Sequence, residues 1–182
     1  MVHFYDEEEA MQQSVASFLA GGMLRGAPAM VIMKPERAQG VKARLEQMGV
    51  DVRRALEVRQ LALHDSIEMI DRIMIDGMPD EQRFREIVGG PAASLTEIWR
   101  PLQLLAFGDM VDVLIGRGQR EATIELERLW DDVAHRVGFS VYCAYAAKNF
   151  RQEADRATFD AICRHHGAIV PAGELAAPEL SA

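Results

Sequence analysis

The sequence is poor in the features that several common protein classes require. Its 182 residues include only two cysteines, which form no Cys-x-x-Cys pair, so the usual zinc and dithiol redox motifs are absent. No apolar run approaches the roughly 18–20 residues of a membrane-spanning helix, and the acidic N-terminal segment is unlike a signal peptide. We therefore expect a cytoplasmic protein without a membrane span, in which Cys143 and Cys163 are buried free thiols.

Positive charge is also scarce. Lys and Arg together number 20 against 28 Asp and Glu, which gives a formal net charge of −8. A nucleic-acid-binding face needs clustered basic side chains for the phosphates, so we expect no direct nucleic-acid contact. The length suits a single domain, which we place at residues 1–171. Residues 172–182 show no periodic pattern and are predicted to be a disordered tail.

Motifs for phosphate binding and for nucleophilic catalysis are missing as well. None of the three lysines, at positions 34, 42 and 148, is followed by Ser or Thr, and none lies in a glycine-rich loop. A working P-loop is therefore excluded, because it needs backbone amides and a Lys-Ser/Thr pair around the phosphates. Gly-x-Gly-x-x-Gly and Gly-x-Ser-x-Gly do not occur either. The sequence thus lacks the usual dinucleotide fingerprint and the usual nucleophile elbow.

The sequence does contain a regular alternation of short apolar runs and amphipathic segments. Such alternation is typical of βαβ units and predicts an α/β fold with three α/β/α layers around a mostly parallel central sheet. The predicted strands are residues 29–33, which come first, then 61–63, 102–107, 139–145 and 168–170. The predicted helices are residues 6–25, 35–48, 51–59, 66–74, 81–88, 94–99, 109–115, 121–137 and 155–165, with a turn at 77–80 and a break at 89–91.

The carboxyl ends of the predicted strands carry the candidate chemistry, because ligands of such sheets bind at that edge. Asp109 directly follows the strand at 102–107 and could hold a metal, but no phosphate loop accompanies it. A cap at the start of the next helix is the favoured interpretation. His64 and Asp65 follow another strand as a candidate acid–base pair, although a cap by Asp65 or Ser66 is again favoured.

Two further groups offer weaker candidates. The pair His165-His166 ends a predicted helix, where a cationic imidazole suits the helix dipole, and the sequence identifies no further ligands for a metal there. Cys143 lies between two tyrosines in a predicted strand. Because side chains alternate along a strand, Cys143 and Tyr145 should share one face while Tyr142 takes the other.

Three groups of short motifs follow one another along the chain. The first is His-Phe-Tyr-Asp at residues 3–6, and the second is Leu-Ala-Leu-His-Asp at 61–65 with Ile-Asp-Gly-Met-Pro-Asp at 75–80. The third comprises Ala-Phe-Gly-Asp-Met-Val at 106–111, Leu-Glu-Arg-Leu-Trp at 126–130 and Phe-Ser-Val-Tyr-Cys-Ala-Tyr at 139–145. In order and spacing they resemble the MEDS domain, a sensory domain of methanogen and methylotroph regulators. The resemblance spans about residues 2–171.

This resemblance implies a degenerate RecA/KaiC-like P-loop fold and a non-catalytic signalling module rather than an enzyme, with no cofactor and no metal. It implies a small organic ligand, such as a simple hydrocarbon derivative, and a partner that is a histidine kinase or a transcription regulator. It also allows a homodimer. The expected ligand-binding residues are those at or near the strand ends: Tyr5, Lys34, His64, Asp65, Phe107, Gly108, Asp109, Met110, Cys143 and Tyr145.

Two alternatives remain open at this point. The chain could be a ligand-free protein–protein adaptor. A sheet edge filled by side chains, together with a large apolar surface, would favour this alternative. It could also be a degenerate nucleotide-binding protein or an enzyme that uses His64 and Asp65. A well-formed cavity beside Asp109 would instead favour the sensor.

Overall fold

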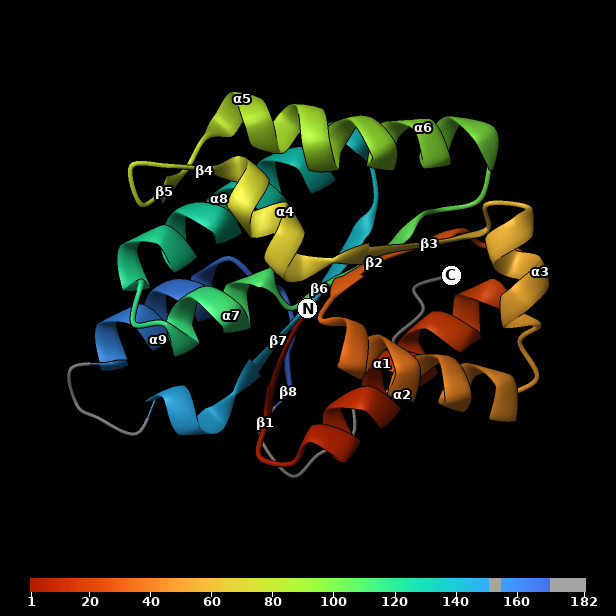
Figure 1. Cartoon of the computed structure of the whole chain (residues 1–182), viewed down its shortest axis with the longest axis horizontal. Coiled ribbons are helices and arrows are strands. Elements are labelled where there is room, and N and C mark those ends of the chain that lie inside the picture. Colours follow the sequence, from red (N-terminus) through yellow and green to blue (C-terminus); the bar gives the residue numbers. More distant parts are fainter. Residues whose placement is uncertain (151–154, 171–182) are drawn as a thin grey trace.

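The computed structural model describes residues 1–150 and 155–170. Within them, six strands form one sheet in which every pair of neighbours is parallel, so the predicted parallel sheet is confirmed. In spatial order the strands are β3 (Leu61–Asp65), β2 (Ala29–Met33), β6 (Leu105–Gly108), β7 (Ser140–Ala146), β1 (Val2–Tyr5) and β8 (Ile169–Val170) (Figure 1). The tail predicted at 172–182 lies outside the described residues.

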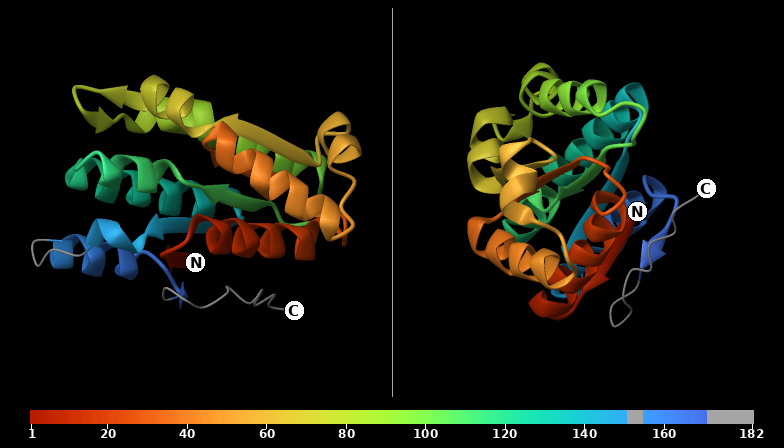
Figure 2. Two further views of the ribbon diagram at one scale, coloured as in Figure 1. Left: turned by 60° about the horizontal axis from the view of Figure 1, so that its bottom comes forward. Right: turned by 90° about the vertical axis from the view of Figure 1, so that its right-hand side faces the viewer.

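Helices cover both faces of the sheet, which confirms the three-layer arrangement (Figure 1 and Figure 2). One apolar core forms between the sheet and α1 (Glu8–Met23), α2 (Pro35–Gln47) and α3 (Val52–Glu57). The other core forms against α4 (Ser66–Ile73), α5 (Glu81–Phe84), the π-helical turn η1 (Arg85–Gly89), α6 (Gly90–Ile98), α7 (Met110–Gly116), α8 (Arg120–Val137) and α9 (Arg156–Arg164).

Ordinary sequence signals set many of the helix ends. Pro35 occupies the first turn of α2, where its missing N–H costs no hydrogen bond. The carboxylates of Asp65 and Asp80 accept the backbone N–H groups of Ile67 and Arg83, at 2.8 and 2.9 Å, and so cap α4 and α5. Asp65 is therefore a helix cap, as the favoured interpretation had it.

The N-terminal strand β1 is the element that the sequence analysis missed, and the prediction that residues 29–33 are the first strand is wrong. β1 pairs with β7 on one side and with β8 on the other. All four of its residues are buried, because helices cover both faces of the sheet at this point. The strand is only four residues long and His3 interrupts its apolar run, so it lacks the continuous apolar stretch from which the buried strands β2 and β6 were predicted.

In the middle of the chain, one local prediction is wrong and another differs in its bounds. The expected break at 89–91 does not occur, because the π-helical turn η1 joins α5 to α6 and Pro91 lies just after this turn, at the start of α6. The expected turn at 77–80 is a hairpin of β4 (Met74–Ile75) and β5 (Met78–Pro79). Its turn residues Asp76 and Gly77 have φ angles of 49° and 82°, as a type I′ turn requires.

The side-chain alternation predicted for β7 is confirmed. Cys143 and Tyr145 belong to the core on the α8 face, whereas Tyr142 belongs to the core on the α1 face. Both cysteines are free thiols, of which Cys143 is buried and Cys163 only half-buried. Among the described residues, no helix has the length and apolar character needed to cross a membrane.

We predict that Phe107→Ala is a destabilising substitution. The Phe107 ring is fully buried on the α1 face and meets the Tyr142 ring edge-on, with 5.5 Å between the ring centroids. Truncating it should lower the free energy of unfolding by about 3–5 kcal/mol, measured by urea denaturation. The control Ile98→Ala removes a side chain of a residue that is 59% exposed and should change the free energy by less than about 0.5 kcal/mol. Equal effects of the two substitutions would contradict the described core.

Candidate functional site

A crevice of about 560 Å³ opens at the carboxyl edge of the sheet. Its walls come from the segment after β1, from the start of α2, from α7 and from the segment after β7, which includes the 3₁₀ helix η2 (Ala147–Phe150). One residue of α4 completes the lining. The lining residues are Tyr5, Asp6, Glu7, Glu8, Lys34, Arg37, Ile67, Asp112, Val113, Gly116, Arg117, Ala146, Lys148 and Asn149.

The topology of the sheet creates this crevice. The helices that follow β1 and β2 pack in one core, and those that follow β6 and β7 pack in the other. Since β2 lies beside β6 and β1 lies beside β7, neighbouring strands send their helices to opposite faces. In an open α/β sheet such a divergence leaves a gap above the strand ends, and that gap is the usual ligand position.

A buried guanidinium joins the walls of the crevice. Arg37, in the first turn of α2, donates through Nη1 to Asp109 Oδ2 at 2.9 Å and to Asp112 Oδ2 at 3.1 Å. Its Nη2 donates to the Tyr5 hydroxyl oxygen at 2.8 Å and to Glu8 Oε2 at 3.1 Å. Asp109 and Asp112 are buried, whereas Glu8 is exposed on one side. We call these five residues the Arg37 cluster.

Asp112 extends the Arg37 cluster to the far wall of the crevice. Its Oδ2 accepts the Tyr5 hydroxyl at 2.8 Å in addition to Arg37. Its Oδ1 accepts the backbone N–H of Ala146 at 2.9 Å and the side-chain amide of Asn149 at 3.1 Å. One carboxylate on α7 therefore holds α2, the end of β1 and the end of β7 in fixed relative positions.

The electrostatics of the cluster follow from burial and from proximity of opposite charges. Burial raises the pKa of Asp109, while Ser66, Arg37 and the Lys34 backbone amide act in the opposite direction. For Arg37, burial disfavours the charge, but Tyr5 and the two aspartates outweigh it and raise the pKa of the guanidinium. Burial and Asp112 likewise raise the pKa of the Tyr5 hydroxyl. Tyr5 therefore stays protonated and can donate to Asp112.

The structure brings only some of the predicted site residues to the crevice. Tyr5 and Lys34 line the crevice, and Asp109 contacts the lining residue Arg37. The favoured interpretation of Asp109 as a helix cap is wrong, because its carboxylate makes no cap hydrogen bond and instead accepts Arg37 and the Lys34 backbone N–H, the latter at 3.3 Å.

The other predicted ligand-binding residues lie away from the crevice lining. Phe107, Met110, Cys143 and Tyr145 are fully buried in the two cores. Gly108 faces the Trp130 ring, from which an added Cβ would be only 3.1 Å away. His64 and Asp65 are half-buried on the edge strand β3 and do not line the crevice. Burial in the cores thus keeps Phe107, Met110, Cys143 and Tyr145 from the crevice, whereas His64 and Asp65 are kept from it by their place on the edge strand.

Sequence reasoning missed Arg37 and Asp112, which organise the site. Arg37 lies three residues after the strand-end residue Lys34, on the first turn of the following helix, a position that faces the carboxyl edge. Asp112 lies three residues after Asp109, so both carboxylates share one face of α7. In the sequence, the signal that could have pointed to this site was the pair of acids three residues apart after one strand, together with an arginine in the first helical turn after another strand.

We predict that Arg37→Met destabilises the protein by about 3–5 kcal/mol, because it leaves two buried carboxylates without a counter-ion. The matched control is Arg44→Met on the same helix, whose guanidinium donates only to the neutral oxygens of Gln12 and Gly40. The control should cost roughly 1 kcal/mol in chemical denaturation. Adding Asp109→Asn to Arg37→Met should recover part of the loss. Equal losses for Arg37→Met and Arg44→Met would show that the cluster is not what makes Arg37 important.

Comparison with known proteins agrees with this architecture. Among solved structures, the chain is similar to the uncharacterized protein PH0321 from Pyrococcus horikoshii, solved in complex with an unknown peptide. The TM-score is 0.69 at 13% sequence identity, over 93% of this chain and 75% of that chain, which supports the α/β fold alone. No curated protein matches the sequence. The model of one protein family, MEDS, the MEthanogen/methylotroph, DcmR Sensory domain, matches residues 1–167. The chain therefore belongs to the MEDS family of sensory domains.

Proposed function

We propose that this MEDS domain binds a small organic ligand in the carboxyl-edge crevice and thereby regulates a partner protein, such as a histidine kinase or a transcription regulator. The family supports a sensory or signalling role. The observation that carries the ligand site is the crevice itself, which lies where the helices of neighbouring strands diverge. In this proposal the domain is not an enzyme, and binding is its only chemical act.

The lining of the crevice favours a ligand with an apolar body and a polar or anionic headgroup. Lys34, Arg117 and Lys148 line the crevice together with the acidic Asp6 and Glu7, and none of these five side chains forms an ion pair with another described residue, so the crevice offers polar contacts of both signs. Ile67 and Val113 add apolar surface to the same walls. A short hydrocarbon derivative that carries a carboxylate or a hydroxyl group would satisfy both kinds of contact.

Signal output would follow from the way in which the crevice is built. A ligand in the crevice touches α2 from one layer and α7 from the other layer at the same time. If two relative positions of these layers differ in their affinity for the ligand, binding shifts the population toward one of them. A partner that contacts the surface of either layer could then read the shift.

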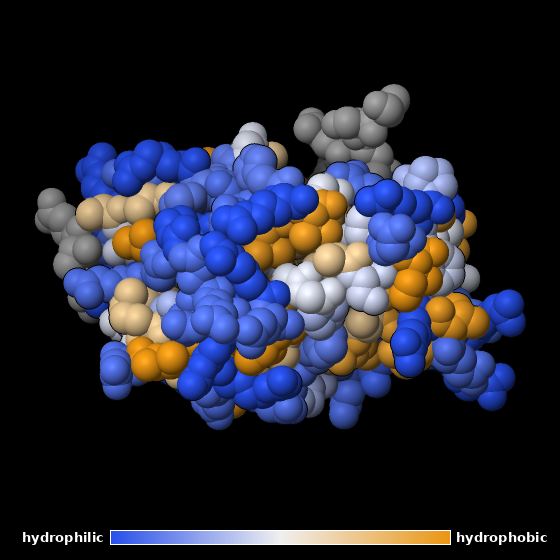
Figure 3. Space-filling model, turned by 90° about the horizontal axis from the view of Figure 1, so that it is seen from above, coloured by the Kyte–Doolittle hydropathy of each residue, from blue (hydrophilic) through white to orange (hydrophobic). Residues whose placement is uncertain are grey.

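The adaptor alternative receives less support from the surface. Large exposed apolar side chains lie on separate elements, among them Leu24, Leu56, Ile75, Ile98 and Ile169. On the face in Figure 3, apolar side chains form several groups with hydrophilic residues between them. An adaptor that works through one broad apolar face would gather such residues into a single patch.

We predict that a short-chain carboxylate or alcohol raises the thermal unfolding temperature of the protein. A ligand at about 100 times its Kd adds about 2.7 kcal/mol of stability, which shifts Tm by several degrees in a domain of this size. The panel should contain short acids, alcohols, ketones and halocarbons, ATP and ADP with magnesium, and a mixture of short peptides. A shift with nucleotide alone would support the nucleotide alternative, and no shift at all would support the adaptor.

The three lysines of the chain provide a matched test of where the ligand binds. Lys34→Ala and Lys148→Ala remove crevice-lining charges, whereas Lys42→Ala removes the charge of a half-buried lysine on α2 that does not line the crevice. For a carboxylate ligand, calorimetry should show that each of the first two substitutions weakens binding by about tenfold, the loss of one charge-assisted hydrogen bond. Lys42→Ala should leave the affinity unchanged. Equal affinities in all three variants would place the ligand elsewhere.

A further inference from the structure

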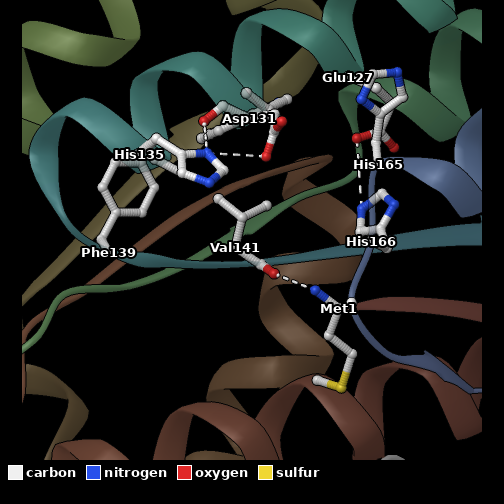
Figure 4. Close-up of a pocket in the computed structure, with 11 residues that line it drawn as sticks. Met1, Glu127, Asp131, His135, Phe139, Val141, His165 and His166 are labelled. Atoms are coloured by element: carbon white, nitrogen blue, oxygen red, sulfur yellow. Dashed lines mark hydrogen bonds and ion pairs between the residues drawn. The ribbon is translucent and has the colours of Figure 1, made fainter.

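A second hollow lies at the opposite, amino edge of the sheet. It has a volume of about 230 Å³ and is lined by the starts of β1 and β7, by the second half of α8 and by the segment after α9 (Figure 4). Glu127 of α8 and His166 of the segment after α9 form part of its wall. Figure 4 shows the His166 ring directed at the Glu127 carboxylate. The carboxyl-edge crevice shares no lining residue with this hollow.

Three potential metal ligands converge on one point at the inner end of this hollow. Glu127 Oε2 lies 3.5 Å from His166 Nε2 and 3.6 Å from Cys143 Sγ. The three ligand atoms all lie within 4.8 Å of one another. Glu127 and Cys143 are buried, and the side chain of His166 is only 5% exposed. The fold thus supplies the ligands that the sequence analysis could not find for the histidine pair.

Neighbouring groups orient the three ligand atoms toward this point. His166 Nδ1 lies 2.9 Å from the carbonyl oxygen of Ile162, and a carbonyl only accepts hydrogen bonds, so Nδ1 carries the ring hydrogen. In the neutral ring, Nε2 therefore presents a lone pair toward Glu127. The Tyr145 hydroxyl donates to Glu127 Oε1 at 2.6 Å, which leaves Oε2 to face the other two ligands. Metal sites commonly fix their histidine and carboxylate ligands in this way.

The geometry points to a zinc-type metal site formed by Glu127, Cys143 and His166, with a fourth position open to the amino-edge hollow. Tetrahedral zinc with bonds of about 2.0–2.3 Å holds its ligand atoms roughly 3.3–3.8 Å apart, which matches the two shorter spacings found here. The Cys143–His166 spacing needs only a small closing movement. Carboxylate, thiolate and imidazole together suit Zn²⁺, and also Co²⁺ as its spectroscopic substitute.

Binding of the metal involves simple proton chemistry. Zn²⁺ replaces the proton of the Cys143 thiol, and this proton leaves to the solvent, so that a thiolate–zinc bond forms and no electron is transferred. The bound ion would compensate for the burial of the Glu127 carboxylate. The ion would join α8, β7 and the segment after α9 at one point, in addition to the hydrogen bond between Tyr145 of β7 and Glu127 of α8.

The direct test is a metal titration of the full chain after dialysis against a chelator. We expect calorimetry to show one equivalent of Zn²⁺ bound per chain. We also expect Co²⁺ to give the visible bands of a tetrahedral site together with a thiolate-to-cobalt charge-transfer band. A chain without a stoichiometric site, or with a cobalt spectrum that lacks the thiolate band, would overturn the proposal.

The chain offers matched controls for two of the ligands. Cys143→Ser should abolish the thiolate band and weaken Zn²⁺ binding by at least about tenfold, whereas Cys163→Ser, at the half-buried second cysteine, should change neither. His166→Gln should weaken binding by at least about tenfold, and His165→Gln should not. Circular dichroism of the metal-free variants checks that each one folds.

Each pair of variants decides the matter independently. If Cys143→Ser does not fold, the affinities of His166→Gln and His165→Gln still test the site, because these residues lie outside the sheet and the helices. Binding that survives both Cys143→Ser and His166→Gln would assign the metal to surface groups and overturn the proposal. The result of this metal titration does not test ligand binding in the carboxyl-edge crevice. The proposed sensory function is therefore tested independently of the metal site.

Discussion

The arrangement of this domain at its carboxyl edge depends on one buried guanidinium. Arg37 comes from a helix of one layer, and the carboxylates of Asp109 and Asp112 come from the start of the helix in the other layer. Desolvation of such buried charges offsets much of their attraction, so the cluster fixes geometry more than it adds stability. By fixing where α2 and α7 start, it determines the shape of the crevice above them. A different relative position of the two layers would have to rearrange these hydrogen bonds.

Strand β7 connects the two polar sites of the molecule. Its Cys143 and Tyr145 side chains reach Glu127 on the α8 face, whereas the backbone N–H of Ala146 donates to Asp112 at the crevice. The two contact sets lie within four consecutive residues of one strand. Polar groups of this kind are rarely buried without partners, and here each carboxylate accepts hydrogen bonds from neighbouring elements. Strand β7 therefore fixes the positions of both sites relative to the sheet.

Much of the fold was predictable from the sequence because it depends on local signals. Alternating apolar and amphipathic runs gave the parallel sheet and the layers, and residues such as Pro35 and Asp65 marked helix starts. The strand β1 was missed because it has only four residues and the polar His3 interrupts its apolar run. The break expected at Gly89-Gly90-Pro91 was wrong because η1 joins α5 to α6 there, a tertiary effect that local patterns do not encode.

The site was less predictable than the fold. Its position at the carboxyl edge followed from general rules for parallel sheets, and Tyr5 and Lys34 were identified from it. Phe107, Met110 and Tyr145 were expected at the crevice but point into the cores, because a strand end alone does not tell which way a side chain faces. Arg37 and Asp112 were missed because their roles depend on contacts between elements that lie far apart in the sequence.

The most direct test of the central claim, that the carboxyl-edge crevice is the ligand site, is chemical-shift mapping of the isotope-labelled protein with short-chain carboxylates and alcohols. We expect the perturbed amides to gather around Tyr5, Lys34, Asp112 and Lys148, where the two helical layers diverge. Perturbations confined to other regions, such as the amino-edge hollow or the outer faces of α5 and α6, would contradict it. No perturbation by any member of the panel would contradict it as well.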